Sequence, residues 1–310
     1  MMRGISIWVA NLFFLMACSS RAPDGGPGGT AAATAAAPVT ATVGLALSTM
    51  DNPFFVSLRD GAQAEANAVG INLIAVDAQN DAARQIAGVE DLIQKKTPVI
   101  LLNPADSDAV ANVVKEATAA GIKVISLDRA VNGAEVSSHI ASDNVAGGRM
   151  AGEFLLKKLG GKGNLVELVG IPGSSAARER GEGFDAAIEG KPGVKVVAKQ
   201  PANFDRAQGL TVMENILQGN KDIQGVFAQN DEMALGAEKA IEEAGLKNVA
   251  IVGFDATPDA VAAVKAGKLA ATVQQKPDLI GKLGVDTAKL LIEGKPVDRN
   301  IAVPLALVTQ

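Results

Sequence analysis

The sequence of 310 residues is poor in the side chains on which disulfide bonding and metal binding depend. It contains one cysteine, one histidine, one tryptophan and no tyrosine. A lone cysteine has no disulfide partner and cannot complete a cysteine–histidine metal site, so we predict no metal and no cofactor. The net charge of −5 offers no basic surface to nucleic acid, which we exclude as a partner.

The same scarcity argues against an enzyme. His139 is the only histidine, and we expect it to make a structural hydrogen bond. Residues 170–175 read GIPGSS, which lacks the G-x-S-x-G arrangement of a nucleophile elbow, and no phosphate-cradling motif follows an apolar run. Asp128 and Asp255 leave open a pair of acids of the kind that cleaves glycosides, but each also suits the binding of hydroxyl groups. We predict no catalytic residue.

The first residues have the pattern of an export signal. Arg3 is followed by a stretch from residue 5 to 17 that is apolar apart from two polar residues, too short for a transmembrane helix. It ends in LMAC, which resembles a bacterial lipobox. We predict a signal peptide over residues 1–17, lipidation of Cys18, and a protein exported to the periplasm or cell surface that touches the membrane only through this anchor. A soluble secreted protein cut near Ala17 is the alternative.

The segment after Cys18 predicts a tether. Residues 19–39 are Ser, Arg, Ala, Pro, Asp, Gly and Thr with almost no large apolar group, so they cannot bury enough surface to order themselves. We therefore assign residues 18–39 to the lipidated cysteine and a flexible tether, and expect the folded part to begin near Val39.

Beyond this point short apolar runs alternate with segments of helical length. Such alternation predicts βαβ units and a parallel sheet covered on both faces. Nine apolar runs are more strands than we expect of one small sheet. Residues 138–144 resemble a connection between two similar halves. We therefore predict an α/β protein of two doubly wound domains. The predicted strands are 43–47, 71–76, 99–102, 124–127, 165–169, 194–197, 225–228, 249–253 and 270–273.

Polar and aromatic side chains follow these strands. Asn, Asp, Arg and Gln gather there, together with Phe54, Phe55, Phe204 and Phe254, four of the seven phenylalanines beyond residue 18. Ligands of open α/β sheets bind outside the carboxyl ends of the strands. Amides, carboxylates and guanidinium groups bind hydroxyls, and aromatic faces cover C–H surfaces, a combination that suits a sugar. The alternative is that the aromatics fill the core and the polar residues cap helices.

Eight motifs follow one another along the chain: STMDNPFF (48–55), LNPADSDAV (102–110), ISLDR (125–129), SHIASDN (138–144), SAARERGEGF (175–184), FAQNDEMALGA (227–237), VGFDATPD (252–259) and KLAATVQQKPD (268–278). They resemble the bacterial periplasmic ribose-binding proteins, members of the periplasmic sugar-binding family that supply substrate to ABC importers. The resemblance extends from about residue 41 to 310.

The resemblance implies a type I periplasmic binding protein, in which two Rossmann-like lobes joined by a three-strand hinge close round one sugar. The first lobe would comprise residues 40–142 and 276–303, and the second residues 143–275 and 304–310. The hinge would lie near residues 142–144, Gln275 and Pro304. The implied sugar contacts are Asn52, Phe54, Phe55, Asn103, Asp128, Arg129, Arg180, Phe204, Asn230, Phe254, Asp255 and Gln275.

The resemblance also implies partners. We expect a monomer that binds D-ribose and delivers it to the membrane permease of an ABC importer, and the sequence leaves a chemoreceptor open as a second partner. Asp51 departs from the family's Asn beside the site. Another sugar (allose, another pentose or a furanosyl signal) stays an alternative ligand. A sugar-responsive repressor would need a helix-turn-helix ahead of the core, where this chain has the predicted export signal.

Overall fold

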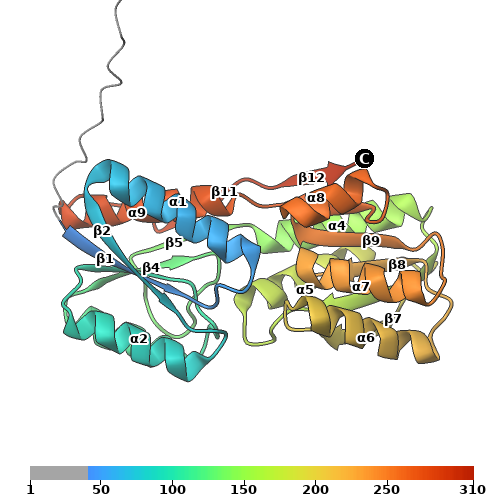
Figure 1. Ribbon diagram of the computed structural model, residues 1–310, viewed down its shortest axis with the longest axis horizontal. Coiled ribbons are helices and arrows are strands. Elements are labelled where there is room, and N and C mark those ends of the chain that lie inside the picture. Colours follow the sequence, from blue (N-terminus) through green and yellow to red (C-terminus); the bar gives the residue numbers. More distant parts are fainter. Residues whose placement is uncertain (1–40) are drawn as a thin grey trace, which may run out of the picture. The chain divides into compact units, whose positions relative to one another are not determined.

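The computed structural model describes residues 41–310 (Figure 1). The predicted signal peptide, the lipidation of Cys18 and the tether to residue 39 lie outside the described residues. Within residues 41–310 no helix is both long and apolar enough to cross a membrane. The described chain forms two six-stranded sheets, each covered by helices on both faces. The prediction of two doubly wound α/β lobes is therefore confirmed.

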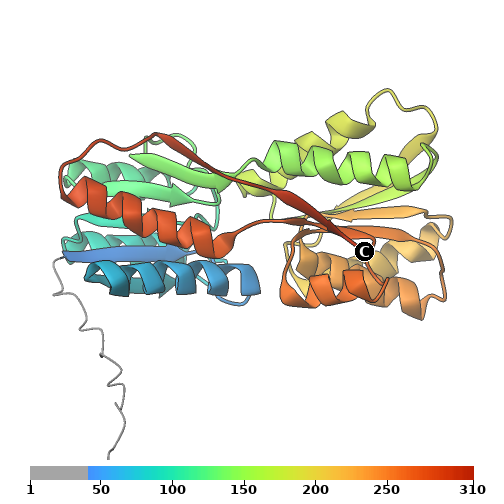
Figure 2. The same cartoon turned by 90° about the horizontal axis from the view of Figure 1, so that it is seen from above.

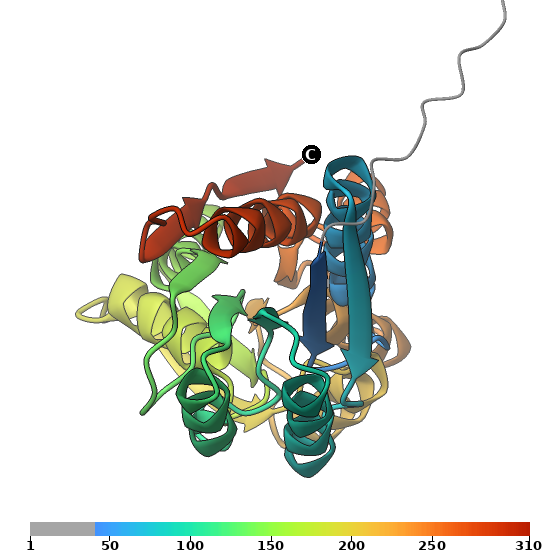
Figure 3. The same cartoon turned by 90° about the vertical axis from the view of Figure 1, so that its left-hand side faces the viewer.

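The sheet of the first lobe is parallel throughout, in the order β11-β5-β4-β3-β1-β2. Helices α1 and α9 cover one face and α2 and α3 cover the other; Figure 3 shows α9 and the helices of the opposite layer on the two sides of the sheet. The elements are β1 (Ala41–Leu47), α1 (Pro53–Val69), β2 (Ile71–Asp77), α2 (Ala82–Gln94), β3 (Val99–Leu102), α3 (Ala111–Ala119), β4 (Lys123–Leu127), β5 (Ser138–Ser142), α9 (Pro277–Ile292) and β11 (Asn300–Val303).

The sheet of the second lobe has the order β12-β10-β9-β8-β6-β7, and only the edge strand β12 is antiparallel to its neighbour. Helices α4 and α5 cover one face, and α6, α7 and α8 the other. The elements are α4 (Asn144–Lys158), β6 (Gly163–Val169), α5 (Ser175–Ile188), β7 (Val194–Pro201), α6 (Arg206–Gly219), β8 (Gly225–Ala228), α7 (Asp231–Glu243), β9 (Ala250–Asp255), α8 (Pro258–Lys265), β10 (Ala271–Gln274) and β12 (Ala306–Thr309).

The chain passes three times from one sheet to the other: after β5, after β10 and between β11 and β12. Figure 2 shows the last of these passages as a red ribbon that runs between the lobes. The carboxyl ends of the parallel strands of both sheets meet the loops between the lobes, which is where such folds bind ligands.

Three strands of the structure are absent from the nine strands predicted from the sequence. Residues 138–144 were predicted to connect two similar halves. The chain does pass to the second sheet after β5, but Ser138–Ser142 themselves form this strand inside the first sheet. This segment has one large apolar residue, so it carries no apolar run. Its burial comes instead from its two neighbouring strands. Strands β11 and β12 are the other two additions.

Candidate functional site

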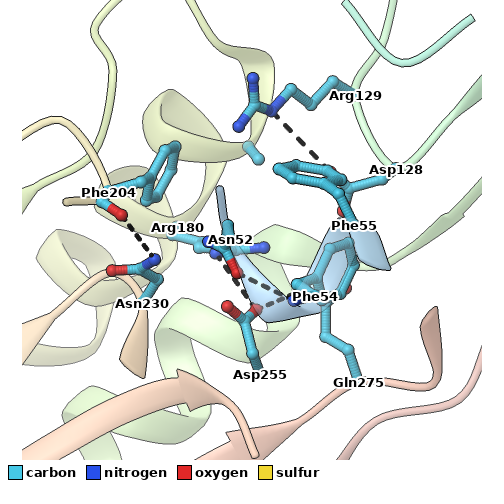
Figure 4. Close-up of a pocket in the computed structure, with 11 residues that line it drawn as sticks. Asn52, Phe54, Phe55, Asp128, Arg129, Arg180, Phe204, Asn230, Asp255 and Gln275 are labelled. Atoms are coloured by element: carbon cyan, nitrogen blue, oxygen red, sulfur yellow. Dashed lines mark hydrogen bonds and ion pairs between the residues drawn. The ribbon is translucent and has the colours of Figure 1, made fainter. Parts of the chain in front are cut away.

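Between the lobes, side chains from the carboxyl ends of both sheets enclose a cleft (Figure 4). The non-atom space between them, counted together with open solvent, is about 240 Å³. Ten of the twelve side chains that the family resemblance implied line this cleft, and Ala176 joins them. The lining residues are Asn52, Phe54, Phe55, Asp128, Arg129, Ala176, Arg180, Phe204, Asn230, Asp255 and Gln275.

Two of the lining amides also cap helices. The Oδ1 atom of Asn52 accepts from the backbone N–H of Phe54 at 2.9 Å, at the start of α1. The Oδ1 atom of Asn230 accepts from Met233 at 3.0 Å, at the start of α7. The capping alternative and the ligand-cleft prediction are therefore compatible at these positions, because each capped helix starts at the cleft.

The aromatic walls come from both lobes. Phe54 and Phe55 occupy the first turn of α1, with their rings edge to face at 5.1 Å between centroids. Phe204 comes from the loop after β7 and has a backbone φ of 60°, in the left-handed region that costs a bulky residue conformational energy. The guanidinium carbon of Arg129 lies 5.1 Å from the Phe55 centroid and 5.4 Å from the Phe204 centroid. Arg129 thus connects the two aromatic walls.

Asp128 and Arg129, directly after β4, supply opposite charges from the first lobe. Both are almost completely buried. Arg129 donates through Nη1 to the carbonyl of Pro104 at 3.0 Å, and its Nε lies 3.8 Å from Asp128 Oδ2. Burial raises the pKa of Asp128 and lowers the pKa of Arg129 to about 10, because a low-dielectric environment disfavours each charged form.

Arg180 on α5 is the corresponding cation of the second lobe. Its Nε donates to Asn144 Oδ1 at 2.9 Å and its Nη1 donates to the carbonyl of Gln229 at 2.7 Å. Its guanidinium carbon stands 3.8 Å from the Phe254 ring centroid, and Nη1 lies 3.8 Å from Asp255 Oδ1. The side chain is therefore held in one position, as a preorganised donor requires.

The position of α5 against α4 depends on glycine. A Cβ atom at Gly148 would lie 2.0 Å from the carbonyl oxygen of Arg180, so only glycine lets the two helices approach this closely. Close packing of α4 and α5 brings Asn144 within hydrogen-bonding distance of Arg180.

Asp255 ends β9, where Gln275 Nε2 donates to its Oδ1 at 2.9 Å. Burial raises the pKa of Asp255 to about 7, although Arg180 and the Gln275 hydrogen bond oppose the rise. The carboxyl group is thus poised between its neutral and charged forms at neutral pH.

Three buried polar atoms of the cleft have no hydrogen-bond partner among residues 41–310: Asp128 Oδ1, Arg129 Nε and Gln275 Oε1. Buried polar atoms are rarely left unpaired, since each costs about 1–3 kcal/mol. Donors and acceptors that lack partners, beside aromatic faces, call for a ligand with several hydroxyl groups and apolar C–H patches.

Asn103 and Phe254 lie behind the lining residues. Asn103 is fully buried; its Oδ1 accepts from Ser48 N at 3.3 Å, and its Nδ2 donates to Leu127 O at 3.0 Å and to Asp128 Oδ2 at 3.3 Å. Phe254 is fully buried beneath Arg180. In this arrangement the two residues hold the side chains that face the cleft, and direct contact between them and a ligand stays a prediction.

Two residues of the site were missed from the sequence. Ala176 lines the cleft, and Asn144 holds Arg180. An alanine carries no polar or aromatic signal, and Asn144 resembles any polar residue at the start of a helix. The packing of α4 against α5 reveals the role of Asn144, and the cleft between the lobes reveals that of Ala176.

Residues 41–310 contain no cluster of three or more metal-ligating side chains. The Nδ1 atom of His139 is hydrogen-bonded to Ser126 Oγ at 2.8 Å, and burial lowers the pKa of this histidine. The imidazole therefore makes the kind of structural contact that we expected.

Comparison with known proteins identifies the class. A model of the periplasmic binding protein domain matches residues 43–296. The chain is 53% identical over 269 residues to the ribose import binding protein of Escherichia coli K12, which covers 87% of this chain and 90% of that protein. It is 47% identical over 304 residues to the ribose import binding protein of Bacillus subtilis 168, which covers 98% of this chain and 97% of that protein.

Solved structures agree. The Caulobacter myo-inositol binding protein superposes with a TM-score of 0.84 at 33% identity, over 87% of this chain and 93% of that one. A periplasmic solute-binding protein of Actinobacillus succinogenes with bound D-allose gives 0.82 at 32% identity, over 87% and 98%. The chain belongs to the periplasmic binding protein family, and its curated relatives are solute-binding proteins rather than enzymes.

Proposed function

We propose that this protein binds D-ribose in the cleft between its lobes and delivers the sugar to the membrane permease of an ATP-driven importer. The observation that carries the proposal is the set of buried atoms without a hydrogen-bond partner, Asp128 Oδ1, Arg129 Nε and Gln275 Oε1, beside the aromatic walls. The relatives at 53% and 47% identity, both named ribose import binding proteins, support ribose as the sugar.

The proposed contacts are the twelve residues implied by the resemblance. Phe54, Phe55 and Phe204 would cover the faces of the sugar ring. Asp128, Arg129, Arg180, Asn230, Asp255 and Gln275 would bind its hydroxyl groups. An unpaired buried polar group costs about 1–3 kcal/mol, so a sugar that leaves one of these groups without a partner would bind about tenfold or more weakly.

Hinge closure is the proposed mechanism. The lobes would comprise residues 40–142 with 276–303 and residues 143–275 with 304–310, and turn about residues 142–144, Gln275 and Pro304. A sugar that touches both lobes binds the closed arrangement more tightly than the open one and so shifts the population toward it. The permease would then meet a surface formed by both lobes.

Another sugar is the second candidate. Structures at 32% and 28% identity hold D-allose and D-arabinose, and a galactofuranose binding protein matches at 30%. These identities are lower than those of the ribose relatives, which favours ribose. A chemoreceptor as a further partner and a monomeric state are proposals of the same kind.

Attachment to the membrane through lipidated Cys18 is also a proposal, supported by the LMAC sequence at residues 15–18. Members of this family are exported to the periplasm. Mass spectrometry of the mature amino terminus tests the anchor: an acylated Cys18 supports it, and an unmodified terminus near this position, as in the soluble alternative, contradicts it.

The function is tested by calorimetric titration of protein that has first been stripped of bound sugar by partial unfolding. We expect D-ribose to bind with a micromolar or lower Kd, a free energy of at least roughly 8 kcal/mol, and xylose, arabinose, allose and glucose to bind much more weakly. Solution scattering should give a smaller radius of gyration with ribose. No binding of ribose by folded, stripped protein would contradict the proposal, and an unchanged radius would contradict hinge closure.

A further inference from the structure

Two loops from opposite lobes are hydrogen-bonded to one another beside the cleft. One follows β3 and contains Ser107, and the other joins β6 to α5 and contains Gly173. Ser107 N donates to Gly173 O at 2.9 Å, and Ser175 N donates to Ser107 Oγ at 3.0 Å. Ala130 N donates to Ser175 Oγ at 2.8 Å. We call these three bonds the closure contact.

The closure contact lies next to the cleft without lining it. Ser107, Ala130, Gly173 and Ser175 are not among the residues that line the cleft. The residues adjacent to two of them are: Arg129 precedes Ala130, and Ala176 follows Ser175. The contact therefore fixes the separation of the lobes at which Arg129 and Ala176 face the same space.

We propose that Ser107 and Ser175 are positioning residues, which set the affinity and dissociation rate of every bound sugar by stabilising the closed arrangement. The proposal rests on the sugar binding proposed above. Ser107 and Ser175 are 0% and 4% exposed, so their partners are shielded from water while the lobes are together. Separation of the lobes lets water replace the lost bonds. Removal of either hydroxyl thus leaves a buried N–H unpaired only in the closed arrangement.

Gly173 adds a steric argument for the same contact. A Cβ atom on Gly173 would lie 2.1 Å from Asp106 Oδ2 of the opposite lobe. Asp106 is held in place, because its Oδ1 accepts from the backbone N–H groups of Asp108 and Ala109, each at 2.9 Å. A side chain at position 173 therefore requires either that Asp106 gives up these two hydrogen bonds or that the two loops separate.

One charged pair also spans the lobes at the same place. Arg178 Nη1 lies 3.9 Å from Asp108 Oδ2, and both side chains are exposed. Exposed pairs at this distance contribute little. The buried serines, and not this ion pair, carry the proposal.

Three serine variants test it. Ser107→Ala and Ser175→Ala are each expected to weaken ribose binding by about tenfold. The weaker affinity should come from faster dissociation of the sugar. The factor should be the same for every sugar that the wild type binds, since the closure contact touches no sugar. Ser174→Ala is the matched control, because Ser174 Oγ is buried in the same loop and has no hydrogen-bond partner within the described residues; its affinity should be unchanged.

Gly173→Ala tests the same contact without removing a hydroxyl group. It should weaken the binding of every sugar at least as much as Ser107→Ala does. The double variant Gly173→Ala with Asp106→Ala should recover part of this loss, because it lacks the clashing carboxylate. Wild-type affinity in Ser107→Ala, Ser175→Ala and Gly173→Ala overturns the proposal, as does a loss confined to one sugar.

Failure of the closure contact is distinguishable from failure of sugar binding. If the stripped wild type binds no sugar, the proposed function fails. If the wild type binds ribose and Ser107→Ala, Ser175→Ala and Gly173→Ala bind it equally well, sugar binding stands and the closure contact fails.

Discussion

Replacement of Arg180 by methionine is expected to weaken ribose binding by about 10³-fold, roughly 4 kcal/mol. Arg180 is 3% exposed and lies 3.8 Å from Asp255, so its removal leaves a buried carboxyl without its cation. The Asn144 and Gln229 acceptors at 2.9 and 2.7 Å also lose their donor. Methionine fills part of the volume above Phe254 but cannot donate to a hydroxyl group.

Calorimetric titration of stripped protein measures this loss, and thermal unfolding shows whether the variant is folded. Arg178→Met is the matched control, since Arg178 lies on the same helix two residues away with its side chain 43% exposed. Its affinity should stay within about twofold of the wild type. Folded Arg180→Met protein that binds ribose within about tenfold of the wild type would contradict the role proposed for Arg180.

The ligand-free protein is expected to lose stability as the pH rises from 5 to 7, and Asp255→Asn should remove much of that loss. Burial raises the pKa of Asp255 from 3.8 to about 7 in the folded state. The folded protein therefore holds this proton over a pH range in which the unfolded chain has released it. The free energy of unfolding consequently falls across this range, by about 2 kcal/mol between pH 5 and pH 7 for this group alone.

Asp231 acts in the same direction. Burial and the charge of Asp255 raise its pKa, so the Asp255→Asn substitution also relieves Asp231. Urea unfolding of stripped protein at pH 5 and pH 7 measures the effect. Asp51→Asn, at an exposed position outside the cleft lining, is the control and should keep the wild-type difference. An equal fall in wild type and Asp255→Asn would be inconsistent with the assignment.

The same substitution should separate stability from binding. Asp255→Asn replaces a carboxylate that two groups hold at the cleft, Arg180 and Gln275, with an amide that no longer needs a countercharge. We expect a more stable free protein at pH 7 and a weaker complex with ribose. Strain and buried charge at a binding site commonly reduce stability in favour of function.

Much of this protein was determined by its sequence alone. The alternation of apolar runs with helical segments predicts two doubly wound lobes, because a strand buried on both faces must be apolar along its whole length. Polar and aromatic residues directly after those strands predict a cleft, because ligands of open α/β sheets bind outside the carboxyl ends of the strands. Ten of the side chains implied by the motifs line that cleft.

Tertiary structure decided the rest. Strands β5, β11 and β12 are short and weakly apolar, and their place in a sheet depends on neighbours distant in the chain. Whether a residue faces the cleft or lies behind it, as Asn103 and Phe254 do, depends on how strands and helices stack. The contact of Ser107 with Ser175 joins residues 68 positions apart. No local pattern encodes such a pairing, because it exists only when two separately folded lobes meet.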